Sequence, residues 1–182
     1  MFEKNIIFHG KHANYLRQLA PSRIAGANIT QRQTIFASNL DVILAASIVG
    51  FVYNRKAVVD RNNDIADNNI FLEQLNTIRD QLELNYRLIM ILDDQKNFSQ
   101  EERIDKAFRY DRNEEKRRPG DETFMAYMLG GIEVLYEKLL EESTSTDEDI
   151  QNTYEFVNSY NKMFGGEISM DDLYKLCNEA SV

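Results

Sequence analysis

Hydrophobic residues recur at helical spacing in three long stretches of the chain, whereas the alternation typical of strands is rare. Between residues 70 and 92 the apolar positions follow one another mostly at steps of three and four, which places them on one buried face of a helix. They are Leu72, Leu75, Ile78, Leu82, Tyr86, Ile89 and Met90. Residues 34–55 and 124–142 are also rich in apolar residues, and each is predicted to form a buried helix.

Three helix-start signals appear between and after these stretches. A hydroxyl at the start of a helix and a carboxylate three residues later can together satisfy the first unpaired backbone N–H groups. Such pairs are Ser99 with Glu102, Thr146 with Asp149, and Ser169 with Asp172. They predict helices over residues 100–110 and 150–164 and a short last helix.

The remaining segments are connectors or short elements. Residues 21–34 and 57–69 are polar, and residues 112–120 are charged and end in Pro119-Gly120, so all three are predicted connectors. Residues 5–8 form either a short strand or a lead into a helix over 11–20. The pattern predicts an all-α protein of about seven helices, with a helical core over residues 1–142 and a C-terminal helical extension over 143–182 packed on it.

Glycine interrupts two of the apolar stretches, at Gly50 and at the pair Gly130-Gly131. Each glycine lowers helix stability by about 1 kcal/mol relative to alanine. Glycine inside a helix usually reflects a close approach of another backbone, a kink or a helix end. We therefore expect close helix packing at these three positions.

Charge is distributed unevenly along the chain. The net charge is −9, but residues 1–61 carry 8 Lys/Arg against 3 Asp/Glu, and residues 62–182 carry 13 against 27. The overall balance argues against indiscriminate coating of nucleic acid. No secretory leader is apparent, and the longest apolar stretch has 12 residues, fewer than the roughly 20 that cross a bilayer. A single cysteine, Cys177, fits a reducing compartment, so we expect a cytoplasmic protein without membrane contact.

Few residues suggest reaction chemistry. His9 and His12 are spaced for a metal site, but no local acid completes it, and the calcium-like opening at Asp60 lacks the later ligands. No phosphate-binding, serine-hydrolase or zinc-protease motif occurs. We therefore predict no catalytic residue, no metal and no cofactor. An enzyme would require His9 or His12 to converge in a pocket with an acid such as Asp41 or Glu133. We expect Glu133 to be exposed on its helix, or else partly buried beside Gly130-Gly131.

Two surfaces are candidates for binding. Asp147, Glu148 and Asp149 form an acidic cluster that is predicted to contact a partner protein, or else is simply a solvated helix face. The alternative is nucleic-acid contact through basic residues of the N-terminal and central regions. These are Lys11, Arg17, Arg55, Lys56, Arg109, Arg117 and Arg118. For the last three, ion pairs with neighbouring acids are the competing interpretation.

Four segments together resemble a known family: LAASIVGFVYNRK, NYRLIMILDD, RIDKAFR and YMLGGIEVLYEKL. They are similar to the small accessory proteins encoded with bacterial DNA-phosphorothioation (Dnd-type) modification and restriction systems. The resemblance covers residues 36–140, and the chain departs from it in a longer loop at 57–69 and in the acidic extension after Glu141. It implies a cytoplasmic accessory protein of DNA modification, restriction or phage defence, and it supplies no catalytic residues.

The sequence thus leads to one principal hypothesis and one alternative. The principal hypothesis is a non-catalytic accessory or assembly subunit that binds larger defence proteins, such as an ATPase or a nuclease, with self-association as a further option. The alternative is a nucleic-acid-binding protein that acts through the basic residues named above.

Overall fold

The computed structural model describes residues 3–21, 34–62, 64–93, 98–110 and 113–163. Within these residues the chain forms seven α-helices, one π-helical turn and two three-residue strands, so the all-α prediction is confirmed. In chain order the elements are β1 (Ile6–Phe8), α1 (Gly10–Leu19), α2 (Asn39–Val52), β2 (Asn68–Ile70), α3 (Leu72–Thr77), α4 (Arg79–Leu92), α5 (Gln100–Ile104), η1 (Asp105–Arg109), α6 (Glu114–Leu139) and α7 (Thr146–Met163). The predicted last helix and Cys177 lie outside the described residues.

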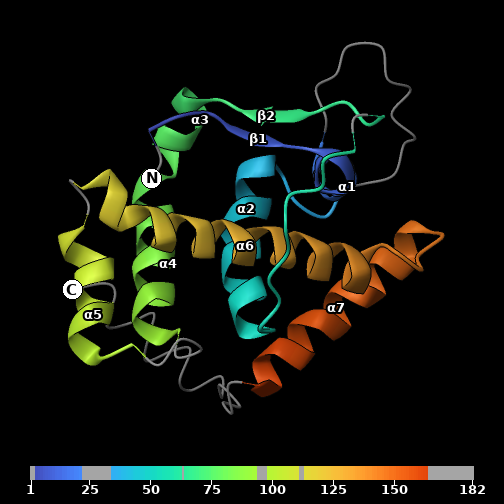
Figure 1. The fold of residues 1–182 in the computed structure, drawn as a ribbon. Helices are drawn as coiled ribbons and strands as arrows, with labels where there is room; N and C mark the ends of the chain where they lie inside the picture. Colours follow the sequence, from blue (N-terminus) through green and yellow to red (C-terminus); the bar gives the residue numbers. More distant parts are fainter. Residues whose placement is uncertain (1–2, 22–33, 63, 94–97, 111–112, 164–182) are drawn as a thin grey trace, which may run out of the picture.

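Helix α6 is the centre of the fold. Every residue from Tyr127 to Leu135 is buried, so this part of the helix is enclosed on all sides. Figure 1 shows α6 crossing in front of α2 and α4, with α1 and the small sheet above it and α7 beside its C-terminal end. In this enclosed part the residues are apolar or glycine on every side of the helix except at Glu133, rather than along one stripe.

The glycines lie where backbones touch. A Cβ on Gly131 would lie 1.8 Å from the carbonyl oxygen of Ala46, and a Cβ on Gly50 would lie 1.9 Å from that of Tyr127. Only glycine permits this crossing of α2 and α6. Gly130 contacts a different part of the backbone: a Cβ added there would lie 2.0 Å from the carbonyl oxygen of Arg55, in the segment that follows α2.

Helices α2 and α4 and a small sheet surround α6. Helix α4 buries Leu82, Tyr86, Ile89 and Met90, which belong to the face that the spacing predicts. Helix α2 begins at a serine cap, because the hydroxyl oxygen of Ser38 accepts a hydrogen bond from the amide of residue 41 at 3.3 Å. The predicted strand near the N-terminus is present as β1, which pairs antiparallel with β2. Strand β2 was not predicted, because it is short and lies in a polar segment.

Several predicted boundaries are wrong. The helix predicted over 34–55 is shorter at both ends, because α2 spans Asn39–Val52. Residues 112–120 are not all connector, because α6 begins at Glu114 and contains both Pro119 and Gly120. Asn113 caps this start by accepting from the amide of Lys116 at 3.0 Å, and Gly120 is buried against Tyr86. The helix predicted over 70–92 is divided at residue 78 into α3 and α4.

The helix predicted over 100–110 begins as expected. Ser99 and Glu102 form the capping box: the Ser99 amide donates to the Glu102 carboxylate at 2.8 Å, and the Glu102 amide donates to the Ser99 hydroxyl at 3.2 Å. The α-helix then changes into the π-helical turn η1 at Asp105. A local capping signal therefore identifies the start of an element but not its later hydrogen-bonding pattern.

Candidate functional site

A buried carboxylate, Glu133 of α6, organises a polar centre inside the fold. Its Oε1 atom lies 2.8 Å from Nζ of Lys11 and 3.1 Å from Nε2 of His12. Its Oε2 atom lies 3.3 Å from a terminal nitrogen of Arg55, which also reaches Glu137 at 3.0 Å. Three separate parts of the chain (α1, the segment after α2, and α6) therefore meet at one side chain.

The surroundings fix the charge state of this centre. Burial alone would raise the pKa of Glu133, but the hydrogen bonds of Lys11 and Arg55 and the charge of Lys11 outweigh it and hold the pKa below its usual value. The hydrogen bond to Glu133 raises the pKa of Lys11. Burial lowers the pKa of His12, so its ring stays neutral near pH 7. Because an ionised carboxylate only accepts, Nε2 of His12 carries the proton that is donated to Glu133.

The loop before β2 closes this centre at the start of α1. The carboxylate of Asp60 accepts a hydrogen bond from the amide of Lys11 at 2.7 Å and from that of Asn62 at 3.1 Å. Gly10 has a φ of +52°, and a Cβ there would lie 2.2 Å from the Asp60 carboxylate. Asp60 therefore supplies the acceptor that the first turn of α1 needs.

The geometry of the Glu133 centre fits a structural clamp better than a reactive site. His12 and Glu133 do converge, as an enzyme would require, but both side chains are buried. Two large cavities among the described residues are lined by other side chains. Because Nε2 of His12 donates to Glu133, Nδ1 would be the basic nitrogen, but it is buried and has no hydrogen-bond partner among the described residues. His9 pairs instead with Asp67 at 2.8 Å, and Asp41 pairs with Ser38 at the start of α2.

The seven basic residues of the nucleic-acid hypothesis all contact acceptors or aromatic rings within the chain. Lys11 and Arg55 pair with Glu133, and Arg17 donates to the carbonyl oxygens of Ala66 and Asp67. Lys56 lies 3.4 Å from Asp93 and 4.3 Å from the centre of the Tyr127 ring. The remaining ion pairs are Arg109 with Asp105 at 2.6 Å, Arg117 with Asp121 at 3.1 Å and Arg118 with Glu122 at 3.0 Å.

Four of these basic residues lie at two separate places along α6. Arg117 and Arg118 lie near the start of α6, whereas Lys11 and Arg55 meet at Glu133, roughly 24 Å further along the helix at 1.5 Å per residue. A phosphate backbone would have to compete with the internal partners at both places. Direct nucleic-acid contact stays a prediction, and these contacts do not favour it.

The acidic residues assigned to partner binding differ in exposure. Asp147 and Glu148 are exposed at the start of α7, whereas Asp149 is only 2% exposed and could meet a partner only where it lines the groove described below. The start of the helix also differs from the prediction. Ser145, rather than Thr146, accepts from the amide of Glu148 at 3.3 Å, and the Glu148 carboxylate accepts from the Thr144 amide at 2.6 Å. The one-residue shift turns Asp149 inward.

Helix α7 presents an apolar stripe to solvent. Ile150, Tyr154 and Val157, at steps of four and three, are 62%, 65% and 48% exposed. On the other side of the helix, Phe156 packs on Tyr53 with ring centres 6.1 Å apart. The stripe borders a groove of about 430 Å³. Its lining residues are Thr34, Ile35, Thr146, Asp149, Ile150, Thr153, Tyr154 and Val157.

The sequence analysis missed this stripe. Apolar residues at 150, 154, 156, 157 and 160 cover more of the α7 circumference than one buried face requires. That excess is the signal that could have revealed an exposed apolar face. It is informative only once the structure shows which of these residues are covered.

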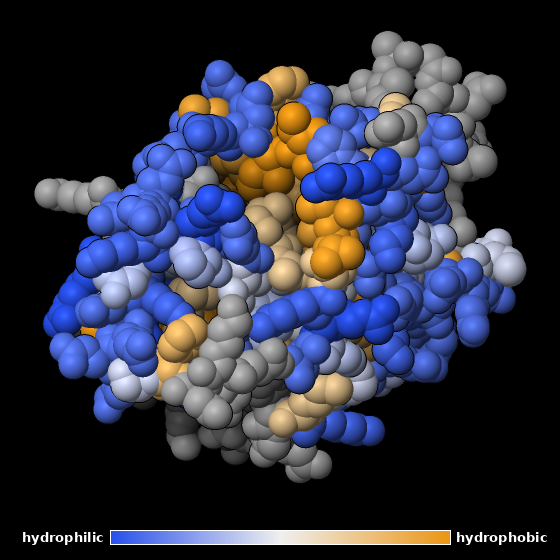
Figure 2. Space-filling model, in the orientation of Figure 1, coloured by the Kyte–Doolittle hydropathy of each residue, from blue (hydrophilic) through white to orange (hydrophobic). Residues whose placement is uncertain are grey.

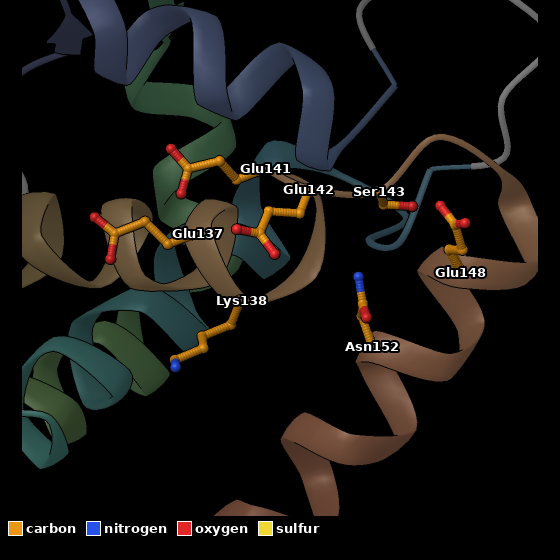
Figure 3. A pocket seen from close by; sticks show the side chains of 7 residues that line it. All are labelled: Glu137, Lys138, Glu141, Glu142, Ser143, Glu148 and Asn152. Atoms are coloured by element: carbon orange, nitrogen blue, oxygen red, sulfur yellow. The ribbon is translucent and has the colours of Figure 1, made fainter.

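A second cavity, of about 560 Å³, lies between the end of α6 and the start of α7. Figure 3 shows Glu148 and Asn152 rising from α7 toward the turn after α6, which carries Glu142, while Lys138 lies on the last turn of α6. Glu137 and Glu141 point away from α7 in this view. Such a cluster attracts cations in general but selects none, and no three His, Cys, Asp or Glu side chains of the described residues converge as a metal site requires.

Apolar residues are also exposed elsewhere, including Leu84, Leu88 and Leu92 along α4 and the loop between α2 and β2. Figure 2 shows that the face in front of α6 is mostly hydrophilic and that its hydrophobic residues gather in the upper and central part. On the loop between α2 and β2, Val58 and Val59 are 84% and 49% exposed. The cavities described above do not include these valines, so the loop offers apolar contact without the groove that accompanies α7.

None of the described helices combines the length and the apolar composition needed to cross a membrane. Comparison of the chain with protein-family models, curated proteins and solved structures finds no match. Among the described residues, the exposed stripe and groove of α7 are the features that point to binding.

Proposed function

We propose that the protein is a non-catalytic accessory subunit that binds a larger partner protein through α7. The observation that carries this proposal is the exposed stripe of Ile150, Tyr154 and Val157 beside the groove. Contiguous exposed apolar residues next to a groove are typical of surfaces that another protein covers. The resemblance noted in the sequence supports a bacterial DNA-modification or anti-phage defence system as the setting, with an ATPase or nuclease as the partner.

The stripe is large enough to matter for affinity. Complete burial of an isoleucine or valine side chain contributes about 1.5–3 kcal/mol, and roughly half of each side chain in the stripe is still exposed. Covering all three therefore contributes about 3 kcal/mol, or about a hundredfold in the dissociation constant. The buried clamp at Glu133 complements this role, because it ties α1, the loop and α6 into a rigid base.

Capture from the native host tests the proposal. Tagged wild-type protein and the double variant Ile150→Ser, Val157→Ser are each used to isolate partners after nuclease treatment. We expect one or a few larger proteins to be recovered with the wild type and lost with the α7 variant. The matched control is Val58→Ser, Val59→Ser, which removes two exposed apolar residues from the loop between α2 and β2 and should leave capture unchanged.

Two results would contradict the proposal. Recovery of the same proteins with the α7 variant would show that the stripe is not the contact. Recovery that disappears on nuclease treatment would show that nucleic acid bridges the proteins, which would favour the basic residues instead.

A further inference from the structure

The apolar stripe of α7 begins with an acid. Asp147 precedes Ile150 by three residues and Tyr154 by seven, so Asp147, Ile150, Tyr154 and Val157 follow one another along the same side of the helix. Asp147 is exposed. Any element that lies along this side meets one carboxylate and then three apolar side chains, over a length of about 15 Å.

The charges around the stripe have one predominant sign. Among the exposed side chains of α7, Asp147, Glu148 and Glu155 carry negative charge and Lys162 carries positive charge. The glutamate-lined cavity of Figure 3 lies on the opposite side of α7 from the stripe. A helix is about 10 Å across and the Debye length is about 8 Å at physiological salt, so the charges of that cavity are largely screened at the groove and the acids of α7 itself set the local potential.

We infer that the α7 surface receives an amphipathic helix of the partner protein, with apolar residues on one face and Lys or Arg beside them. This inference rests on the proposed function and names the chemistry of the element bound at that same surface. A helix fits because its apolar residues recur at the same steps of three and four as the stripe. Basic residues fit because they would lie against Asp147 and within the negative potential of α7.

A second copy of this chain fits the surface less well. Two copies of α7 packed together would oppose acids with acids, because Asp147, Glu148 and Glu155 outnumber Lys162. Three apolar side chains also provide only part of a stable interface, which typically takes about 20–30 residues from each side. A partner with basic residues is attracted by the acids of α7, whereas two copies of α7 would repel each other through the same acids.

Binding of designed peptides to the full chain tests this inference by fluorescence anisotropy. The probe is a labelled synthetic helix of about 18 residues, the length of α7, with leucines at steps of three and four and lysines at the flanks. One comparison peptide keeps the leucines and replaces every lysine by glutamate. The other keeps the composition of the lysine peptide in a scrambled order that has no apolar face.

We expect the lysine peptide to bind at least ten times more tightly than either comparison peptide. The double variant Ile150→Ser, Val157→Ser should weaken this binding at least tenfold, and Asp147→Asn should weaken it about threefold and reduce its salt dependence. Two control variants should leave it unchanged: Val58→Ser, Val59→Ser on the loop, and Glu114→Gln, Glu115→Gln at the start of α6. The peptide comparison uses wild-type protein, so it remains decisive if a variant fails to fold.

Several results would overturn the inference. Equal binding of the glutamate or scrambled peptide would remove the basic or the helical requirement, and an equal loss in a control variant would place the contact elsewhere. A dimer in light scattering that the α7 variant dissociates would identify a second copy as the occupant. Much tighter peptide binding after replacement of residues 22–33 by a glycine-serine linker would identify that segment of the chain as the occupant.

These failures are distinguishable from failure of the proposed function. If capture of host proteins depends on α7 but the lysine peptide does not bind, the partner presents another chemistry at the same surface. If capture does not depend on α7, the proposed function itself is wrong.

Discussion

Replacing Gly131 by alanine tests the central packing of the fold. In an ordinary helix this change is favourable by about 1 kcal/mol, because alanine is the better helix former. Here the new Cβ would lie 1.8 Å from the carbonyl oxygen of Ala46 and 2.8 Å from the amide nitrogen of Gly50. Both obstructing atoms belong to the backbone of α2, so no side chain can rotate away to relieve the contact.

The expected loss follows from the movement that alanine requires. Restoring an ordinary contact of about 3.4 Å means moving α2 and α6 apart by about 1.5 Å at their crossing. A gap of that size loses much of the dispersion energy between facing atoms, and overpacking typically costs about 1–3 kcal/mol even where side chains can adjust. Because both obstructing atoms are backbone, we expect a gross cost of about 4 kcal/mol, above that range. After the propensity gain of about 1 kcal/mol, the net loss is about 3 kcal/mol, which lowers the Tm by about 6–12 °C.

Urea unfolding followed by circular dichroism measures this loss. Gly120→Ala is the matched control, since it is the same substitution in the same helix, and the nearest atom is the hydroxyl of Tyr86, at the end of a side chain. We expect the control to change the free energy of unfolding by less than about 1 kcal/mol. A Gly131→Ala protein as stable as the wild type, or more stable, would refute the reasoning, because it would show that the two helices are not in backbone contact.

Two further predictions concern buried ionisable side chains. Burial lowers the pKa of His12, so at mildly acidic pH the unfolded chain binds a proton at this residue more readily than the folded protein does. The contribution of neutral His12 to the free energy of unfolding is therefore fully present above the ordinary pKa of 6.5 and is lost as the pH falls below it. Between about pH 7.5 and pH 5.5 the free energy of unfolding should therefore fall more for the wild type than for His12→Gln. Glu133 and Asp60 have lowered pKa values and stay ionised in that range, so they do not add to the difference. Parallel pH profiles of the two proteins would contradict the prediction. Asp149→Lys should destabilise the protein by about 3 kcal/mol or more because the side chain is buried, whereas Asp147→Lys should change stability by less than about 0.5 kcal/mol. Equal urea midpoints for these two variants would show that Asp149 is not buried.

The features that the sequence predicts correctly are local ones. The buried face of α4 follows from spacing alone, because residues three and four apart share a side of a helix. The capping box of Ser99 and Glu102 is equally local, since both hydrogen bonds join residues three apart. Fold class is predictable for the same reason, because long apolar stretches, three- and four-residue spacing and helix-start signals can each be read from a short part of the sequence.

The features that the sequence does not predict depend on distant parts of the chain. Pro119-Gly120 is typical of a connector, yet the helix continues through both residues, and Gly120 fits against Tyr86 of another helix. Glu133 meets His12 across 121 positions and Arg55 across 78, so the polar centre becomes visible only when the fold is known. Asp149 lies beside two exposed acids in the sequence and is nonetheless buried.

The same long-range contacts decide which charges are available to a partner. The N-terminal part of the chain has a surplus of basic residues, but Lys11 and Arg55 neutralise Glu133, and Arg17 is bound to backbone carbonyl oxygens. Asp147 and Glu148 at the start of α7, by contrast, remain exposed. A polyanion would therefore meet basic residues that already have partners and a chain with a net charge of −9, whereas a basic helix would meet exposed acids beside an apolar groove. The charge pattern that first suggested two binding surfaces thus favours α7 once the fold shows where each charge is used.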